Sequence, residues 1–230
     1  MKIIKNEKLI ERNGKIGQWM SLASLIVLGL GLYISFKMPE YFVYSIVCLV
    51  IGFTMTQISI YMGNRWGRSP RADEKFDAGL KGLHSDFVIY HFSSPVSHLL
   101  IGPSGAWVLH PLHQRGKISY QKNRWKLSNG GFLQAYMSVF GQEGLGRPEI
   151  DAENEVQALR KFLAKKMDES TIPEIKPILV FTNDEIEVDA GDSPIAAMRL
   201  KQLKEFMRQG GKNRSLSNEQ IKALSDALES

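Results

Sequence analysis

The chain has 230 residues, one cysteine and a formal net charge of +5. The lone Cys48 excludes a disulfide framework and a cysteine metal cluster. The basic excess is confined to residues 1–17 and 65–81, which carry +3 and +2, so the net charge does not by itself indicate a nucleic-acid-binding protein. Both segments flank an apolar region, where basic residues fit attraction to anionic lipid headgroups.

Two apolar runs dominate the N-terminal part of the chain. No charged residue occurs between Ile16 and Phe36 or between Tyr41 and Asn64. A helix of about 20 residues crosses the roughly 30 Å hydrocarbon layer, so both runs are long enough to span it. We predict a transmembrane helical hairpin whose Ser and Thr residues bond across the helix interface. The predicted segments are a basic cytoplasmic N-terminus at 1–17, the hairpin at 18–62 with spans at 18–36 and 41–62, and a juxtamembrane linker at 63–72.

Two alternatives to this hairpin are a cleaved signal peptide and a helix pair buried in a soluble core. A signal peptide has one shorter apolar region, and soluble helices usually keep a polar stripe, which Leu22 to Leu32 lacks apart from Ser24. Lys and Arg flank the outer ends of the runs, whereas the connecting loop has only Lys37, so both termini should be cytoplasmic. We expect a multi-pass protein of the inner (cytoplasmic) membrane, with Trp19 and Trp66 as interfacial anchors.

The rest of the chain has mixed periodicity, which predicts an α/β domain. In chain order we expect a helix at 73–83, strands at 87–92, 96–102, 106–109 and 117–120, a helix at 151–167, a strand at 178–181, and helices at 200–208 and 216–228. The run from Ile178 to Phe181 is typical of a strand buried on both faces. Ser217 and Gln220 predict a capping box at the last helix.

Several short motifs in this domain carry a family resemblance. They are the run from Ser97 to Leu109, Gly116-Lys117-Ile118 with Trp125 downstream, and the strand from Ile178 to Asn183 that ends in Phe-Thr-Asn. Over residues 73–210 they resemble the nuclease-related domain, the NERD family. The resemblance implies a restriction-endonuclease-like mixed sheet flanked by helices, with an Asp and a Glu-x-Lys on adjacent strands that bind Mg²⁺ and activate water. Residues 211–230 would form a C-terminal linker and helix.

The catalytic positions of that family are occupied by other residues in this chain. The family's Asp falls on Ser97, its Glu on His110 and its Lys on Leu112, and no acidic residue occurs between Pro95 and Lys117. We therefore expect a non-catalytic domain without a cofactor. It would bind or scaffold at the cytoplasmic membrane face, with nucleic acid or an unidentified protein as its partner.

Two other functions stay open at this point. One is an active nuclease with a rearranged site that uses Mg²⁺ or Mn²⁺, and the other is a structural, partner-binding membrane protein. The acids that could serve the rearranged site are Asp73, Glu74 and Asp77, which otherwise solvate the start of a helix.

Two further groups of residues are candidate binding sites. A basic segment without an intervening acid, interleaved with aromatic residues, is typical of a nucleic-acid surface. The same pattern is also typical of a segment that binds anionic lipid or an acidic protein, or of a solvated edge strand. The segment consists of Arg115, Lys117, Lys122, Arg124, Trp125 and Lys126. His98, His110 and His113 are a candidate transition-metal site, with ordinary hydrogen-bonded histidines as the alternative.

The glycine-rich segment over residues 130–148 could be mistaken for a phosphate-binding loop. It lacks the Gly-Lys-Ser/Thr ending of that motif, so we predict no nucleotide site there. We expect a short amphipathic helix at Phe132 to Phe140, which would pack on the domain or touch the bilayer.

Overall fold

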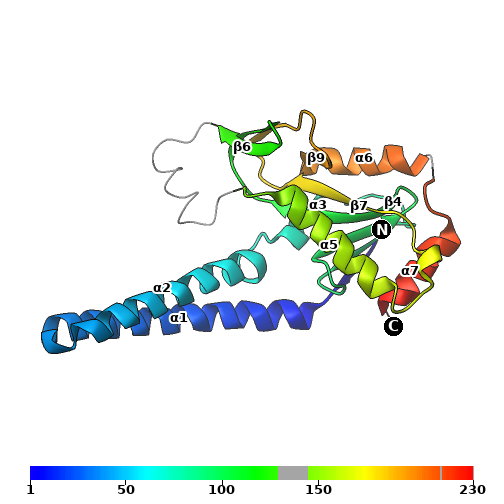
Figure 1. Ribbon diagram of the computed structural model, residues 1–230. Helices are drawn as coiled ribbons and strands as arrows, with labels where there is room; N and C mark the ends of the chain where they lie inside the picture. Colours follow the sequence, from blue (N-terminus) through cyan, green and yellow to red (C-terminus); the bar gives the residue numbers. More distant parts are fainter. Residues whose placement is uncertain (129–144, 213, 230) are drawn as a thin grey trace. The chain divides into compact units, whose positions relative to one another are not determined.

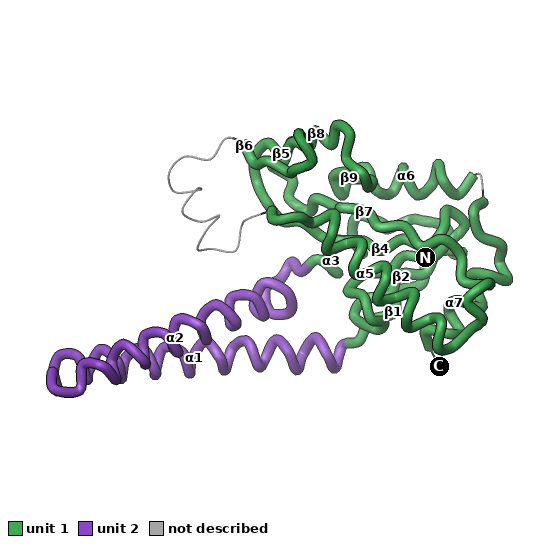
Figure 2. Tube along the Cα trace, in the orientation of Figure 1, with its two compact units in different colours: residues 1–6, 72–230 green, residues 7–71 purple. Residues whose placement is uncertain are grey.

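The computed structural model describes residues 1–128, 145–212 and 214–229, and its chain forms two compact units (Figure 1). Unit 1 comprises residues 1–6 and 72–230, and unit 2 comprises residues 7–71 (Figure 2). The first six residues therefore belong to the same unit as the C-terminal part of the chain. This differs from the expected boundary, which assigned residues 1–17 to a separate basic segment.

Unit 2 is a helical hairpin of α1 (Glu7–Lys37), η1 (Pro39–Tyr41), α2 (Phe42–Met62) and the π-helical turn η2 (Gly63–Gly67). By length and composition, both long helices could cross a bilayer. Their large apolar side chains point outward; Leu25 and Phe53, for example, are 64% and 51% exposed. In water such a surface would be unfavourable, so these helices are compatible with a membrane.

Small residues line the contact between the two long helices. The buried ones recur at every seventh position and are Gly17, Ser24 and Gly31 on α1, and Ser45, Gly52 and Ser59 on α2. Small side chains let two helices approach closely. Ser59 Oγ donates to the Gly17 carbonyl at 2.8 Å, which confirms the expected bond across the interface. Thr54 and Thr56 instead donate to carbonyls of their own helix.

Unit 1 is built on a six-stranded sheet with the order β1-β2-β3-β4-β7-β9. The strands are β1 (Lys2–Lys5), β2 (Val88–His91), β3 (His98–Gly102), β4 (Gly105–Leu112), β7 (Ile175–Phe181) and β9 (Ala196–Arg199). β3 runs antiparallel to β2 and β4, and the other pairings are parallel. A second sheet has the order β6-β5-β8. Its strands are β5 (Gly116–Gln121), β6 (Arg124–Ser128) and β8 (Ile186–Asp189).

Helices cover both faces of the large sheet. They are α3 (Ala72–Gly79), α5 (Pro148–Leu163), the 3₁₀ turn η3 (Glu169–Thr171), α6 (Leu200–Lys212) and α7 (Asn218–Glu229). α5 and α7 pack on the face that carries Leu99 and Val108, and Figure 1 shows α5 crossing the strands on this side. α3 and α6 pack on the opposite face, which carries Leu100 and Ile178.

The α/β class is confirmed, and so is the capping box of the last helix. Gln220 N donates to Ser217 Oγ at 3.2 Å, and Ser217 N donates to Gln220 Oε1 at 3.0 Å. α7 is also part of the domain rather than a tail, because Leu224 and Leu228 lie in the core with α5. Periodicity did not predict β1, β6, β8 or β9, all of which are only four or five residues long.

Candidate functional site

The carboxyl ends of five parallel strands meet at one edge of the large sheet. The last residues of these strands are Lys5 of β1, His91 of β2, Leu112 of β4, Phe181 of β7 and Arg199 of β9, and the antiparallel β3 begins at His98 at the same edge. Open α/β sheets bind ligands outside this edge. The polar groups gathered there are therefore the first candidates for a site.

A chain of hydrogen-bonded side chains lies at this edge, and we call it the polar chain. Lys5 Nζ lies 3.1 Å from Asp73 Oδ2 and also pairs with Asp77 Oδ2. Asp77 Oδ1 lies 3.1 Å from His91 Nε2, and His91 Nδ1 lies 2.8 Å from His98 Nδ1. The side chains of Asp73 and His91 have no exposed surface. These five residues therefore join β1, α3, β2 and β3 by polar contacts inside unit 1.

Helix and strand periodicity explain why these groups converge. Asp73, Phe76 and Asp77 are three and four residues apart in α3, so they share the helix side that faces the sheet. His91 and His98 are directly paired across β2 and β3, so both side chains leave the sheet on the same face. Phe76 stacks parallel to the His91 ring, with centroids 6.4 Å apart, and meets the His98 ring edge-on at 5.0 Å.

The charges in the polar chain stabilise each other against burial. Burial is the largest influence on the pKa of Lys5 and opposes its charged form, but hydrogen bonds to Asp77 and Asp73 outweigh it and raise that pKa above 10.5. Burial likewise opposes ionisation of Asp77, but hydrogen bonds from His91 and Lys5 hold its pKa below 3.8. Lys5 and Asp77 are therefore an ion pair at neutral pH.

The histidine pair has a restricted hydrogen-bonding pattern. Only one hydrogen fits between two ring nitrogens 2.8 Å apart, so one imidazole donates and the other accepts. The exposed fractions of His91 and His98 are 0% and 1%. The pair is therefore shielded from solvent, and the arrangement favours a structural role for the polar chain over a reactive one.

The three positions equivalent to the nuclease motif lie on the other face of the sheet. His110 and Leu112 alternate with Leu109 along β4 and so face α5. Continuing the β3–β4 register by two residues brings Ser97 opposite His110. His110 Nδ1 lies 3.3 Å from Glu155 Oε1 on α5. The motif positions thus gather at one place, where they offer a hydroxyl, an imidazole and an apolar side chain, with one carboxylate from α5.

The acids named as replacements are not at this place. Asp73, Glu74 and Asp77 belong to α3, which packs on the opposite face from α5. Asp73 and Asp77 are also bonded to Lys5. A rearranged site that uses these three acids is therefore not formed around the motif positions.

The three histidines of the candidate metal site are also separated. His98 faces α3, His110 faces α5, and His113 follows β4 with its side chain exposed. Across residues 1–128, 145–212 and 214–229, no group of three His, Cys, Asp or Glu side chains is arranged to hold a metal ion. Strand alternation places His98 and His110 on opposite faces of the sheet. The spacing in the sequence could not reveal this, because it depends on the register between the strands.

The basic segment forms the hairpin of β5 and β6, closed by a two-residue turn. Lys122 and Asn123 both have positive φ, at 52° and 57°, as a type I′ hairpin turn requires. The basic side chains are exposed, and they are Arg115, Lys117, Lys122, Arg124 and Lys126. Trp125, in contrast, is 6% exposed and meets Phe181 with ring centroids 5.9 Å apart. The expected surface role of Trp125 is therefore wrong, because alternation turns it into the core.

Acidic residues stand beside part of this basic face. β8 pairs with β5 so that Glu187 lies next to Lys117 and Asp189 next to Ser119. Both acids are exposed. The positive charge of the hairpin is therefore concentrated along β6 and the turn, on the side away from β8.

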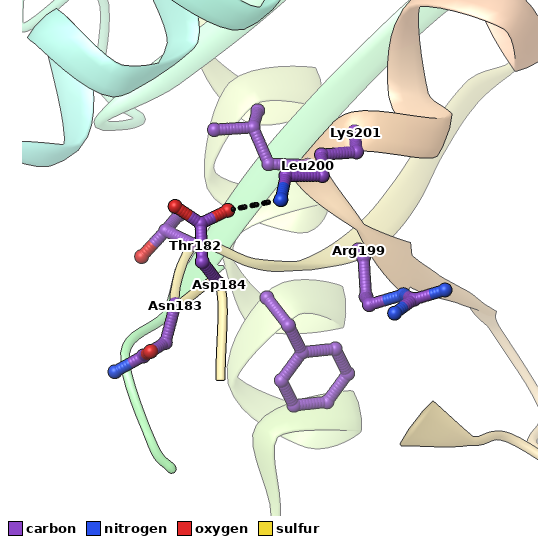
Figure 3. Close-up of a pocket in the computed structure, with 7 residues that line it drawn as sticks. Thr182, Asn183, Asp184, Arg199, Leu200 and Lys201 are labelled. Atoms are coloured by element: carbon purple, nitrogen blue, oxygen red, sulfur yellow. Dashed lines mark ion pairs between the residues drawn. The ribbon is translucent and has the colours of Figure 1, made fainter. Parts of the chain in front are cut away.

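A small hollow lies where β7 and β9 end, and Figure 3 shows its lining residues. Asp184 and Lys201 form an ion pair there at 2.9 Å, while Asn183 and Arg199 extend to opposite sides (Figure 3). Lys75 Nζ also donates to the Thr182 carbonyl at 3.3 Å. The hollow has a volume of about 20 Å³, which is room for a water molecule rather than a substrate.

Comparison with known proteins adds no identification. No family model matches the chain, and neither a curated protein nor a solved structure matches it. The amphipathic helix expected at Phe132 to Phe140 lies outside the described residues.

Proposed function

We propose that α1 and α2 anchor this chain in the inner (cytoplasmic) membrane, with both termini in the cytoplasm. Basic residues flank the outer ends of the hairpin, and only Lys37 lies near the connecting turn. This asymmetry is the usual determinant of orientation. The flanking residues are Lys8, Arg12 and Lys15 before the first apolar run, and Arg65, Arg68 and Arg71 after the second.

Unit 1 would be a NERD-like domain of the restriction-endonuclease-like class that has lost catalysis. Two features support this proposal. β3 and β4 are adjacent strands in a mixed sheet with helices on both faces, as the resemblance implies. Ser97, His110 and Leu112 occupy one place on that sheet, and none of them is an acid or a lysine.

The activity we propose for unit 1 is sequence-independent binding of nucleic acid at the membrane. The observation that carries it is the exposed basic face along β6 and the turn of the β5–β6 hairpin, formed by Lys122, Arg124 and Lys126. Such cations neutralise phosphates and release counterions, which gives affinity that falls steeply with salt. Trp125 is buried and is not available to stack on bases. The exposed lysine and arginine side chains would contact phosphates, which carry no sequence information, so we expect little sequence preference.

Binding is tested with the purified full chain in detergent and with fluorescent duplex DNA and RNA over a series of salt concentrations. The variant Lys122→Gln/Arg124→Gln/Lys126→Gln should reduce the slope of log affinity against log salt by about 0.9 for each duplex phosphate contact that is lost. The control removes three exposed charges from the end of α5 and the turn after it, as Arg160→Gln/Lys161→Gln/Lys165→Gln. Equal losses in the two variants, or no binding at low salt, would refute the proposal and favour a protein partner.

Metal-dependent cleavage is the second candidate, because Glu155 contacts the position of the family's Glu. The family mechanism uses two carboxylates and a lysine, whereas the motif positions here have one carboxylate in contact, so these residues fit Mg²⁺ or Mn²⁺ poorly. The same samples, incubated with Mg²⁺ or Mn²⁺, decide between the two. Cleavage that is present in the natural chain and lost in Glu155→Gln would overturn the non-catalytic proposal.

A further inference from the structure

Unit 2 contains a groove of about 460 Å³ between the start of α1 and the chain around η2. α1 residues from Glu7 to Gln18 line one side, and Trp66, Gly67 and Arg71 line the other. This volume is within the range of small-molecule sites in proteins. The groove therefore has room for a ligand larger than an ion or a water molecule.

The backbone, rather than flexible side chains, shapes this groove. Gly14 is buried, and a Cβ at that position would lie 3.3 Å from the Trp66 carbonyl oxygen, so a side chain there would push the two segments slightly apart. The turn itself is wide, since Arg68 N donates to the Gly63 carbonyl five residues earlier at 2.8 Å. Such π-helical turns are frequent at functional sites.

The charges that line the groove are balanced and ordered. Two are basic, Lys15 and Arg71, and two are acidic, Glu7 and Glu11. Along α1, Lys15 is next to the apolar run that begins at Ile16, and the two acids lie one and two helical turns farther from that run. Lys15 Nζ and Glu11 Oε1 are 2.6 Å apart, and both side chains are largely exposed.

We propose that this groove binds the headgroup of a zwitterionic phospholipid that carries a primary ammonium, namely phosphatidylethanolamine. This inference rests on the proposed membrane insertion of α1. In a bilayer the phosphate lies nearer the hydrocarbon than the amine does, and along α1 Lys15 is nearer the apolar run while Glu11 and Glu7 lie farther out. The phosphate would contact Lys15, with Arg71 as a second cation from the other side of the groove, and the ammonium would donate to Glu11 and Glu7.

The balanced lining separates this site from general attraction to anionic lipid. An anionic headgroup would satisfy Lys15 and Arg71 but would leave Glu7 and Glu11 facing a negative charge. A choline headgroup has no N–H to donate to these carboxylates. The groove therefore selects the ethanolamine headgroup over both, whereas the other basic residues near the membrane attract anionic lipid without selecting a headgroup.

The test is native mass spectrometry of the full chain in detergent, to which phosphatidylethanolamine, phosphatidylglycerol and phosphatidylcholine with the same acyl chains are added. The natural chain should bind a first ethanolamine lipid about fivefold more tightly than either other lipid, the size of one exposed ion pair. Glu7→Gln/Glu11→Gln should reverse the preference toward phosphatidylglycerol. Lys15→Gln/Arg71→Gln should weaken the first ethanolamine lipid.

The matched control is Arg68→Gln, which removes one charge from the same juxtamembrane segment at a residue that does not line the groove. It should leave the headgroup preference unchanged. A natural chain that prefers phosphatidylglycerol, or a preference unaffected by Glu7→Gln/Glu11→Gln, would overturn the headgroup site. Extraction of the chain from membranes at alkaline pH would instead overturn the membrane anchor, and the headgroup site with it, so the two failures are distinguishable.

Discussion

Replacement of Lys5 by methionine should destabilise unit 1 more than any other single charge removal in β1. Lys5 is 17% exposed and bonds to Asp73, which has no exposed surface. Methionine has nearly the same length but no charge, so Asp73 and Asp77 would keep their negative charges without the ammonium between them. Removing one partner of a buried ion pair costs about 3–5 kcal/mol.

The residual exposure of the lysine favours the lower end of this range. We expect a loss of about 3 kcal/mol in the free energy of unfolding. For a domain of this size, 1 kcal/mol corresponds to a Tm change of about 2–4 °C, so the expected decrease is about 6–12 °C. Fluorescence of Trp107 and Trp125, which both belong to unit 1, reports this transition in the full chain.

Lys2→Met is the matched control, because it makes the same substitution in the same strand. Lys2 is 62% exposed and its partner Glu229 is 48% exposed, at 3.4 Å. Exposed pairs contribute about 0–1 kcal/mol, so this change should move Tm by no more than about 4 °C. Asp73→Asn, combined with Lys5→Met, should recover part of the loss. Equal Tm shifts for the two lysine variants, or no recovery in the double variant, would refute the buried pair.

The histidine pair, the buried Tyr90 and the α1–α2 helical hairpin can each be perturbed separately. His98→Phe should lower the free energy of unfolding of unit 1 by about 1–3 kcal/mol in urea denaturation, because His91 loses a buried hydrogen-bond partner. Burial raises the pKa of Tyr90 from 10.0 to about 12, so the folded unit holds this proton more tightly than the unfolded chain. Its stabilisation is complete below about pH 10 and is lost as the pH rises toward 12, and Tyr90→Phe should flatten that part of a Tm–pH profile. Gly31→Ala should weaken the hairpin against SDS unfolding, because a Cβ there would lie 2.8 Å from a side chain on α2, whereas Gly29→Ala, which faces open space, should not.

The elements that were predictable from the sequence are those that local pattern determines. The apolar runs gave the two long helices, and the run from Ile178 to Phe181 gave the buried centre of β7, because each feature is visible in consecutive residues. The pattern of consecutive residues could not predict β1. Its four residues form a strand only because they pair with β2, which begins at Val88, more than eighty residues later.

The polar chain was missed for the same physical reason. Asp73 and Asp77 have the spacing of one helix side, which is a visible signal, but acids at a helix start usually face solvent. Their burial depends on Lys5, and nothing local to α3 indicates that a lysine reaches them. Trp125 shows the opposite error, because its basic neighbours on β6 suggested a surface while strand alternation turned it inward.

The discontinuous domain leads to a final prediction about how a soluble form of unit 1 must be made. Residues 1–6 supply β1 and Lys5, so a fragment that starts at Ala72 leaves Asp73 and Asp77 without their lysine. Lys5 Nζ lies 3.1 Å from Asp73 Oδ2, so the end of β1 and the start of α3 are close together in space. A flexible linker of about eight residues, at about 3.3 Å per residue, is long enough to replace residues 7–71.

This replacement protein should be soluble and should unfold within about 3 °C of unit 1 in the full chain, since a short loop adds little closure entropy. The fragment that starts at Ala72 should have a lower Tm than the linked protein. The decrease should be at least as large as the one that Lys5→Met causes in the full chain, because the fragment loses both the same cation and the strand that carries it. Thermal unfolding of the two soluble proteins side by side measures the difference. If the fragment is as stable as the linked protein, then β1 does not contribute to the fold, and the polar chain does not hold the domain together.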